Sequence, residues 1–137
     1  MAKKKNEIEV TVAEVVDYLR IAGQFAPVLR EVVGRKITAE AARKRRIKVG
    51  TAELQKAVDV FRAVNGLSKA SDTARWLKAS GITVEILEAY IETNILISKL
   101  KDALEKKTSK SKYVSTPGIK ESVRDMIYQD WLKSQLK

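Results

Sequence analysis

The chain has 137 residues, of which 45% are hydrophobic and 32% are charged, and its net charge is +10. It contains neither Cys nor His, so disulfide bonds, thiolate metal sites, a Cys nucleophile and a histidine base are excluded. Only two Pro and six Gly occur, which favours an all-helical fold. We expect one domain that is not an enzyme and that binds no metal or cofactor.

The N-terminus has basic residues but no apolar run after them, unlike a secretory signal. No stretch approaches the roughly 18 apolar residues of a membrane span. We therefore expect a cytoplasmic protein that does not enter a membrane. Residues 1–6 are predicted to be a disordered basic lead.

Two helices are predicted before residue 50. The first begins after Thr11, which forms a capping box with Glu14, and ends near Gly23. The second has Pro27 in its first turn, where the missing N–H is tolerated, and closes in the basic run 43–46.

Residues 51–104 predict three consecutive helices, separated by breaks at Asn65-Gly66 and Ser80-Gly81. Their predicted N-caps are Thr51, then Ser68 or Ser71, then Thr83. The third helix has two apolar stripes, which is typical of a helix buried between neighbours. One stripe is Leu87, Ile91 and Ile95, and the other is Ile86, Tyr90, Ile97, Leu100 and Leu104.

The C-terminal part reads as a basic linker, 106–116, and a last helix, 117–137, with Thr116 as N-cap and Pro117 at the first position. The apolar face of this helix comprises Ile119, Val123, Met126, Ile127, Trp131 and Leu136. Such a helix must dock on an apolar surface. It docks either on the core of its own chain, residues 1–105, or on the core of a second copy in a helix-swapped dimer. We thus expect a compact all-α domain of about six helices, present as a monomer or a helix-swapped homodimer.

Residues 51–104 resemble the N-terminal chaperone domain of the parvulin-type peptidyl-prolyl isomerases, the SurA family, especially its cyanobacterial type. The last helix resembles the C-terminal helix of that family, which returns to the chaperone core. The matching residues are Glu53-Leu54, Phe61-Arg62, Asn65-Gly66-Leu67, Asp72-Thr73, Trp76-Leu77-Lys78, Gly81-Ile82-Thr83, Glu85, Glu88, Lys99-Leu100, the Ile47-Lys48-Val49 link and 123–132.

One departure from the family concerns the isomerase itself. In the family a parvulin domain of about a hundred residues, an ordinary domain size, lies between the core and the last helix. Here only the linker occupies that place. The resemblance therefore implies a chaperone framework without prolyl isomerase activity.

The favoured function is the binding of unfolded or extended polypeptide segments, with acidic flanks preferred by the cationic rim. We expect an apolar groove between the core and the C-terminal helix. Its candidate residues are Phe61, Trp76, Leu77, Tyr90, Ile127 and Trp131.

Two other functions remain open. A basic face could bind nucleic acid through Arg43, Lys44, Arg45, Arg46, Lys48, Lys106, Lys107, Lys110 and Lys112. The chain could also be a scaffold, or a subunit that recognises a leader peptide.

Overall fold

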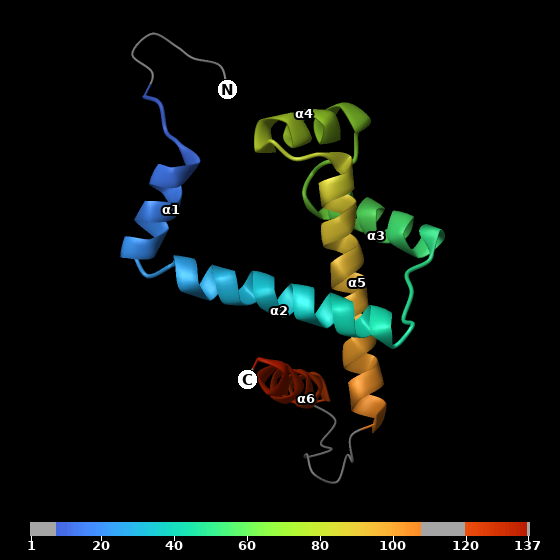
Figure 1. Cartoon of the computed structure of the whole chain (residues 1–137). Helices are drawn as coiled ribbons and strands as arrows, with labels where there is room; N and C mark the ends of the chain where they lie inside the picture. The colour runs from blue at the N-terminus through green and yellow to red at the C-terminus, as the bar shows by residue number, and fades with distance from the viewer. Residues whose placement is uncertain (1–7, 108–119, 137) are drawn as a thin grey trace. The chain divides into compact units, whose positions relative to one another are not determined.

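The computed structural model describes residues 8–107 and 120–136, and the regular structure in these ranges is entirely α-helical (Figure 1). The helices are α1 (Val12–Ile21), α2 (Phe25–Lys44), α3 (Thr51–Val64), α4 (Ala70–Ser80), α5 (Val84–Lys107) and α6 (Lys120–Gln135). The prediction of an all-α fold of about six helices is confirmed. Among the described residues, none of the helices has the length and apolarity needed to cross a membrane.

The chain divides into two compact units, Met1–Gly34 and Arg35–Lys137, and the boundary between them falls inside α2. We expected a linker at 106–116, but α5 continues through its first two residues to Lys107. The rest of that linker, the N-terminal lead and the predicted Thr116-Pro117 helix start lie outside the described residues.

Several helix ends follow from local side-chain chemistry, as predicted. The Thr11 hydroxyl accepts from the Glu14 N–H at 3.1 Å, and the Glu14 carboxylate accepts from the Thr11 N–H at 3.0 Å. Thr83 caps α5 by accepting from the Ile86 N–H at 3.1 Å. Gly81 ends α4 with a φ of 72°, a conformation in which a Cβ would be strained.

Two predicted caps are wrong. Gly50, not Thr51, is the N-cap of α3, because the Glu53 carboxylate reaches back to the Gly50 N–H at 3.3 Å. Lys69 rather than Ser68 or Ser71 is the N-cap of α4, and it makes no side-chain cap bond.

In the second unit, α5 lies at the centre, with α6 beside its C-terminal half, α3 beside its middle and α4 near its N-terminal end (Figure 1). The main buried cluster combines the end of α2, the C-terminal half of α5 and α6. Its members are Ala39, Ala42, Leu96, Leu100, Leu104, Ile127 and Tyr128. Because Leu100 is 0% exposed, this cluster anchors α5 between two neighbours, as the sequence predicted for a central helix.

The apolar stripes of α5 and α6 are only partly as predicted. Ile86 and Tyr90 of α5 are half exposed, Ile97 is partly buried, and only Leu100 and Leu104 of the second stripe are fully buried. Met126 of α6 and Leu136 just after α6 are also half exposed. Ile119 lies outside the described residues, as does the side chain of Val123.

Tyr128 of α6, which the sequence analysis did not place in the core, is 7% exposed. Its hydroxyl is hydrogen-bonded to the buried Thr38 hydroxyl of α2 at 3.0 Å. Lys101 of α5 places its ammonium 4.7 Å from the centre of the Tyr128 ring. Tyr128 is buried here because its polar end has a partner within the core.

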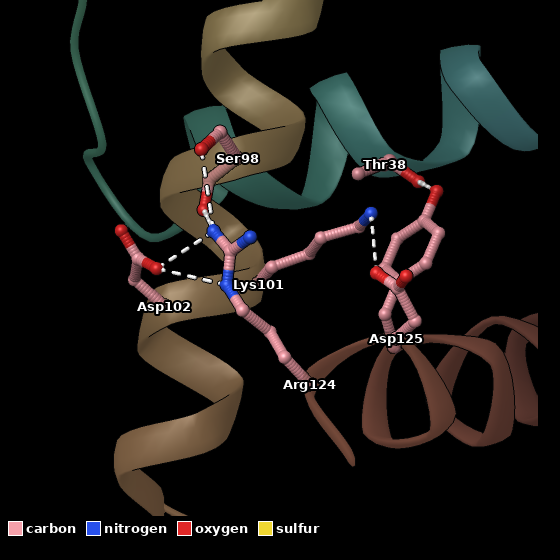
Figure 2. Close-up of polar contacts among 7 residues, drawn as sticks. Thr38, Ser98, Lys101, Asp102, Arg124 and Asp125 are labelled. Carbon is pink, nitrogen blue, oxygen red and sulfur yellow. Dashed lines mark hydrogen bonds and ion pairs between the residues drawn. The ribbon is translucent and has the colours of Figure 1, made fainter. Parts of the chain in front are cut away.

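Polar contacts fix the register of α6 on α5 (Figure 2). The Arg124 guanidinium donates to Asp102 at 2.7 and 3.1 Å, and Lys101 donates to Asp125 at 3.1 Å. Lys101 and Asp102 are adjacent on α5, and Arg124 and Asp125 are adjacent on α6. Each of these residues thus pairs with a residue of opposite charge on the other helix. A register that exchanged these partners would put like charges together and is disfavoured.

The first unit, taken by itself, joins α1 to residues 25–34 of α2 through a turn at Gly23, whose φ is 73°. The Arg20 guanidinium lies 4.6 Å from the centre of the Phe25 ring. Gly34 is the only buried residue in the described part of this unit. We refer to residues 8–34 as the arm.

The contact between Thr38 and Tyr128 predicts a measurable coupling between α2 and α6. In a double-mutant cycle of Thr38→Val and Tyr128→Phe, we expect a coupling energy of about 1 kcal/mol, the usual net value of a buried hydrogen bond. Urea unfolding measures it. Tyr18→Phe is the matched control, because Tyr18 is 68% exposed and its loss of a hydroxyl should leave stability unchanged. Additive effects of the two core substitutions would contradict the contact.

Candidate functional site

A cleft of about 650 Å³ lies between α3 and α5. Its apolar lining consists of Ala57, Val60, Phe61, Ile91 and Ile95, and its polar lining of Glu53, Asn94, Ser98, Lys99 and Asp102. Val60 is 55% exposed, while Ile91 is 4% exposed, so apolar surface extends from the buried interior to the solvent edge. An apolar surface with a few fixed polar groups is typical of a binding site.

The polar residues of α5 in this cleft form a ladder. Asn94, Ser98 and Asp102 are spaced four residues apart, so they lie on one side of the helix at intervals of about 6 Å along its axis. We call these three residues the polar ladder.

Each member of the polar ladder is held by a residue from another helix. Arg35 of α2 donates to the Asn94 side-chain oxygen at 2.8 Å and to the Tyr90 carbonyl at 3.1 Å. Arg124 of α6 donates to the Ser98 carbonyl at 2.9 Å and hydroxyl at 3.2 Å, and to Asp102 (Figure 2). With its oxygen engaged, Asn94 has amide N–H groups to offer as donors. The ladder is therefore fixed in position before any ligand binds.

The α3 side of the cleft is tied to α5 by an ion pair. Lys99 donates to the Glu53 carboxylate at 2.7 Å and to the Lys48 carbonyl at 2.7 Å. The hydrogen bond from Lys99 lowers the pKa of Glu53 below its ordinary value of 4.5, and the Gly50 N–H adds to this effect, against desolvation. One carboxylate thus caps α3 and joins it to the central helix.

The lowered pKa of Glu53 predicts a loss of stability in acid. A carboxylate with a lowered pKa in the folded protein contributes stability above its unfolded pKa, and loses it as pH falls through the folded value. Glu53→Gln should therefore weaken the pH dependence of thermal unfolding on the acid side of pH 4.5. An NMR titration of the Glu53 carboxyl group measures the pKa directly. Lys99→Met should return it toward 4.5, and an unshifted pKa in the unmodified protein would contradict the ion pair.

The predicted groove residues lie at different sites in the structure. Phe61 lines the α3–α5 cleft and packs against Trp76 of α4, with ring centres 5.8 Å apart. Leu77 lines a smaller hollow of about 330 Å³ between α3, α4 and α5. Tyr90 is half exposed and carries the Arg35 guanidinium over its ring at 4.5 Å.

The other two predicted groove residues lie in the packed cluster at the C-terminal half of α5. Ile127 is 5% exposed and belongs to the core, and Trp131 packs against it. Ile127 is thus part of the packed contact between α5 and α6. The cleft described above lies on the α3 side of α5.

The candidate polyanion-binding residues differ in whether they form ion pairs with carboxylates. Arg43 pairs with Glu92 at 3.5 Å, and Lys44 pairs with Glu40 at 3.3 Å. Arg45, Arg46 and Lys48 are exposed and have no carboxylate within ion-pair distance among the described residues, and Lys106 is exposed as well. The Lys107 side chain, Lys110 and Lys112 lie outside the described part of the chain.

Sequence reasoning missed the polar ladder and the two arginines that hold it. The spacing of Asn94, Ser98 and Asp102 was a usable signal, because four-residue intervals place side chains on one side of a helix. Arg35 and Arg124 had no such signal, since their partners are far away in the sequence. In the described part of the chain, no group of three or more carboxylates could hold a metal ion.

Comparison of the chain with protein-family models, with curated proteins and with solved structures finds no match. The resemblance to the SurA family stays a prediction.

Proposed function

We propose that this protein is a non-catalytic peptide-binding module that holds apolar, extended segments of other polypeptides in the α3–α5 cleft, and that it acts in the cytoplasm. The observation that carries this proposal is the polar ladder beside an apolar surface. Side chains such as Phe61 and Ile95 offer burial for apolar residues of the client. Asn94 and Ser98 offer hydrogen bonds to its backbone.

The spacing of the polar ladder supports an extended client. Its rungs are about 6 Å apart, and every second residue of an extended chain recurs at about 6.6 Å. Peptide groups on one side of such a chain can therefore meet successive rungs over the length of the cleft. Recognition through backbone groups tolerates many sequences, as a chaperone-like role requires.

The charge of the unit supports a preference for acidic flanks. Residues 35–137 contain 22 Lys and Arg against 12 Asp and Glu, and Lys48 is exposed beside the Lys99–Glu53 pair. Acidic residues next to an apolar segment would be attracted by this surplus at low salt. The SurA resemblance agrees with this client class, and the short linker agrees with a module that lacks an isomerase domain.

A charge placed at the edge of the cleft should weaken peptide binding. Val60→Glu puts a carboxylate among apolar side chains, and we expect the dissociation constant for a labelled apolar peptide to rise at least about tenfold. Val64→Glu is the matched control, since Val64 is 78% exposed on the same helix and does not line the cleft. Fluorescence anisotropy measures binding, and thermal unfolding checks that both variants fold.

Two results would count against the proposal. One is no binding of any apolar peptide at about 0.1 mM, which corresponds to an affinity of about 5 kcal/mol. The other is equal loss of binding in Val60→Glu and Val64→Glu, which would place the site elsewhere. Suppression of aggregation of an unfolded protein is a second readout of the same function.

A second candidate is the binding of nucleic-acid phosphates at the turn after α2. The observation that favours it is the exposure of Arg45, Arg46 and Lys48 without described carboxylate partners. Arg46 also has a φ of 60°, an uncommon conformation for a residue with a side chain. Such a basic turn can contact successive phosphates without reading a sequence.

Salt dependence tests this second candidate. If both arginines contact phosphates, the double substitution Arg45→Gln and Arg46→Gln should reduce the slope of log K against log salt by about 1.8 for duplex DNA. The double substitution Lys69→Gln and Lys78→Gln removes the same charge from exposed positions on and before α4, and it should leave the slope nearly unchanged. Equal slopes in all three proteins, or no retention of DNA at low salt, would exclude a phosphate site at this turn.

A further inference from the structure

Each helix of the arm carries an apolar stripe that is largely exposed, with Val16, Leu19 and Phe25 half-buried. On α1 the stripe comprises Val12, Val15, Val16 and Leu19, and on α2 it comprises Phe25, Val28, Leu29, Val32 and Val33. These residues recur at three- and four-residue intervals, which is the pattern of a helix face that packs on a partner. Val12 is 80% exposed and Val28 is 56% exposed. Exposed apolar surface of this extent typically marks an interaction site.

The arm also differs in charge from the rest of the chain. Residues 8–34 contain four carboxylates, Glu9, Glu14, Asp17 and Glu31, against Arg20 and Arg30, which gives a net charge of −2. Residues 35–137 have a net charge of +10. Two arms would repel each other weakly, whereas an arm and the second unit attract each other. Charge complementarity therefore favours the second unit, rather than a second arm, as the occupant of the stripe.

The α3–α5 cleft has the geometry to receive a helix. Side chains four residues apart on a helix recur at about 6 Å, which is the spacing of the polar ladder, so successive turns of the arm would meet successive rungs. The exposed Val60 offers apolar surface at the edge. We propose that the arm of one copy docks in the α3–α5 cleft of a second copy, reciprocally, to form a closed two-fold dimer.

The dimer would compete with peptide clients, because the arm and the client occupy the same cleft. The inference rests on the cleft of the proposed function but not on its clients. Dimer formation without peptide binding would overturn the proposed function alone. Peptide binding by a strictly monomeric protein would overturn this inference alone.

Single cysteines introduced into the natural sequence, which has none, test the contact directly. A Val15→Cys protein and a Val60→Cys protein of different mass are mixed and oxidised. The proposal expects a disulfide-linked heterodimer as the main product, with a dimeric mass for the unmodified protein by light scattering. A predominant disulfide between two Val15→Cys chains would show arm-to-arm pairing and overturn it. A disulfide within a monomeric double variant would show docking in the same chain and also overturn it.

Charge substitution on the arm provides a second, independent readout. Val15→Glu should raise the dimer dissociation constant at least about tenfold, since it puts a charge into an apolar contact. Ile21→Glu is the matched control, because Ile21 is 89% exposed on α1 and lies about 160° around the helix from the middle of the stripe. Raising salt from about 0.05 to about 0.5 M should weaken the dimer several-fold. A monomeric mass at every concentration, equal effects of the two substitutions, or a dimer insensitive to both would overturn the proposal.

Discussion

The fold of the second unit depends on burying a central helix that is apolar on more than one side. Leu100 and Leu104 of α5 cannot be covered by one neighbour, so both the end of α2 and α6 pack against them. Removing a buried leucine of this kind typically costs about 2–5 kcal/mol, which is a large part of the stability of a domain of this size. The polar contacts of α6 fix its register on α5. Arg124 and Lys101 pair with carboxylates on the facing helix, and a shift would set like charges against each other.

The same packing prepares the cleft on the α3 side of α5. Asn94, Ser98 and Asp102 lie on the side of α5 that α3 leaves partly open, and residues from α2 and α6 hold their side chains. Arg124 therefore serves both the packing of α6 and the geometry of the cleft. Because these side chains are already restrained, they lose less conformational entropy when a ligand binds than the side chains of a mobile surface would. The cleft thus combines apolar surface with donors and acceptors in fixed positions.

Local chemistry made much of the fold predictable. The capping box at Thr11, the left-handed glycines and the cap at Thr83 act within a few residues, and the sequence contains all their parts.

Which side of a helix is buried depends on partners that are distant in sequence. Tyr128 reads as amphipathic but is buried because its hydroxyl forms a hydrogen bond with the Thr38 hydroxyl, whereas Met126 reads as core and is half exposed. The apolar pattern of α6 likewise indicates that this helix docks, but not that Ile127 is the most deeply buried of its described contacts with α5.

The residues that carry the SurA resemblance have structural roles in this chain. Arg62 donates to the Leu67 and Ser68 carbonyls and to Thr73, so it holds the turn between α3 and α4. Glu53 and Lys99 join α3 to α5. A pattern of this kind argues for a shape, because these side chains are occupied by contacts within the protein. Function must therefore be sought in surfaces that such contacts leave open. The apolar stripe of the acidic arm and the cleft beside the polar ladder are two such surfaces. The arm has a net charge of −2, the unit that contains the cleft has a net charge of +10, and the four-residue repeat of the stripe matches that of the polar ladder, so each is a physically suitable partner for the other.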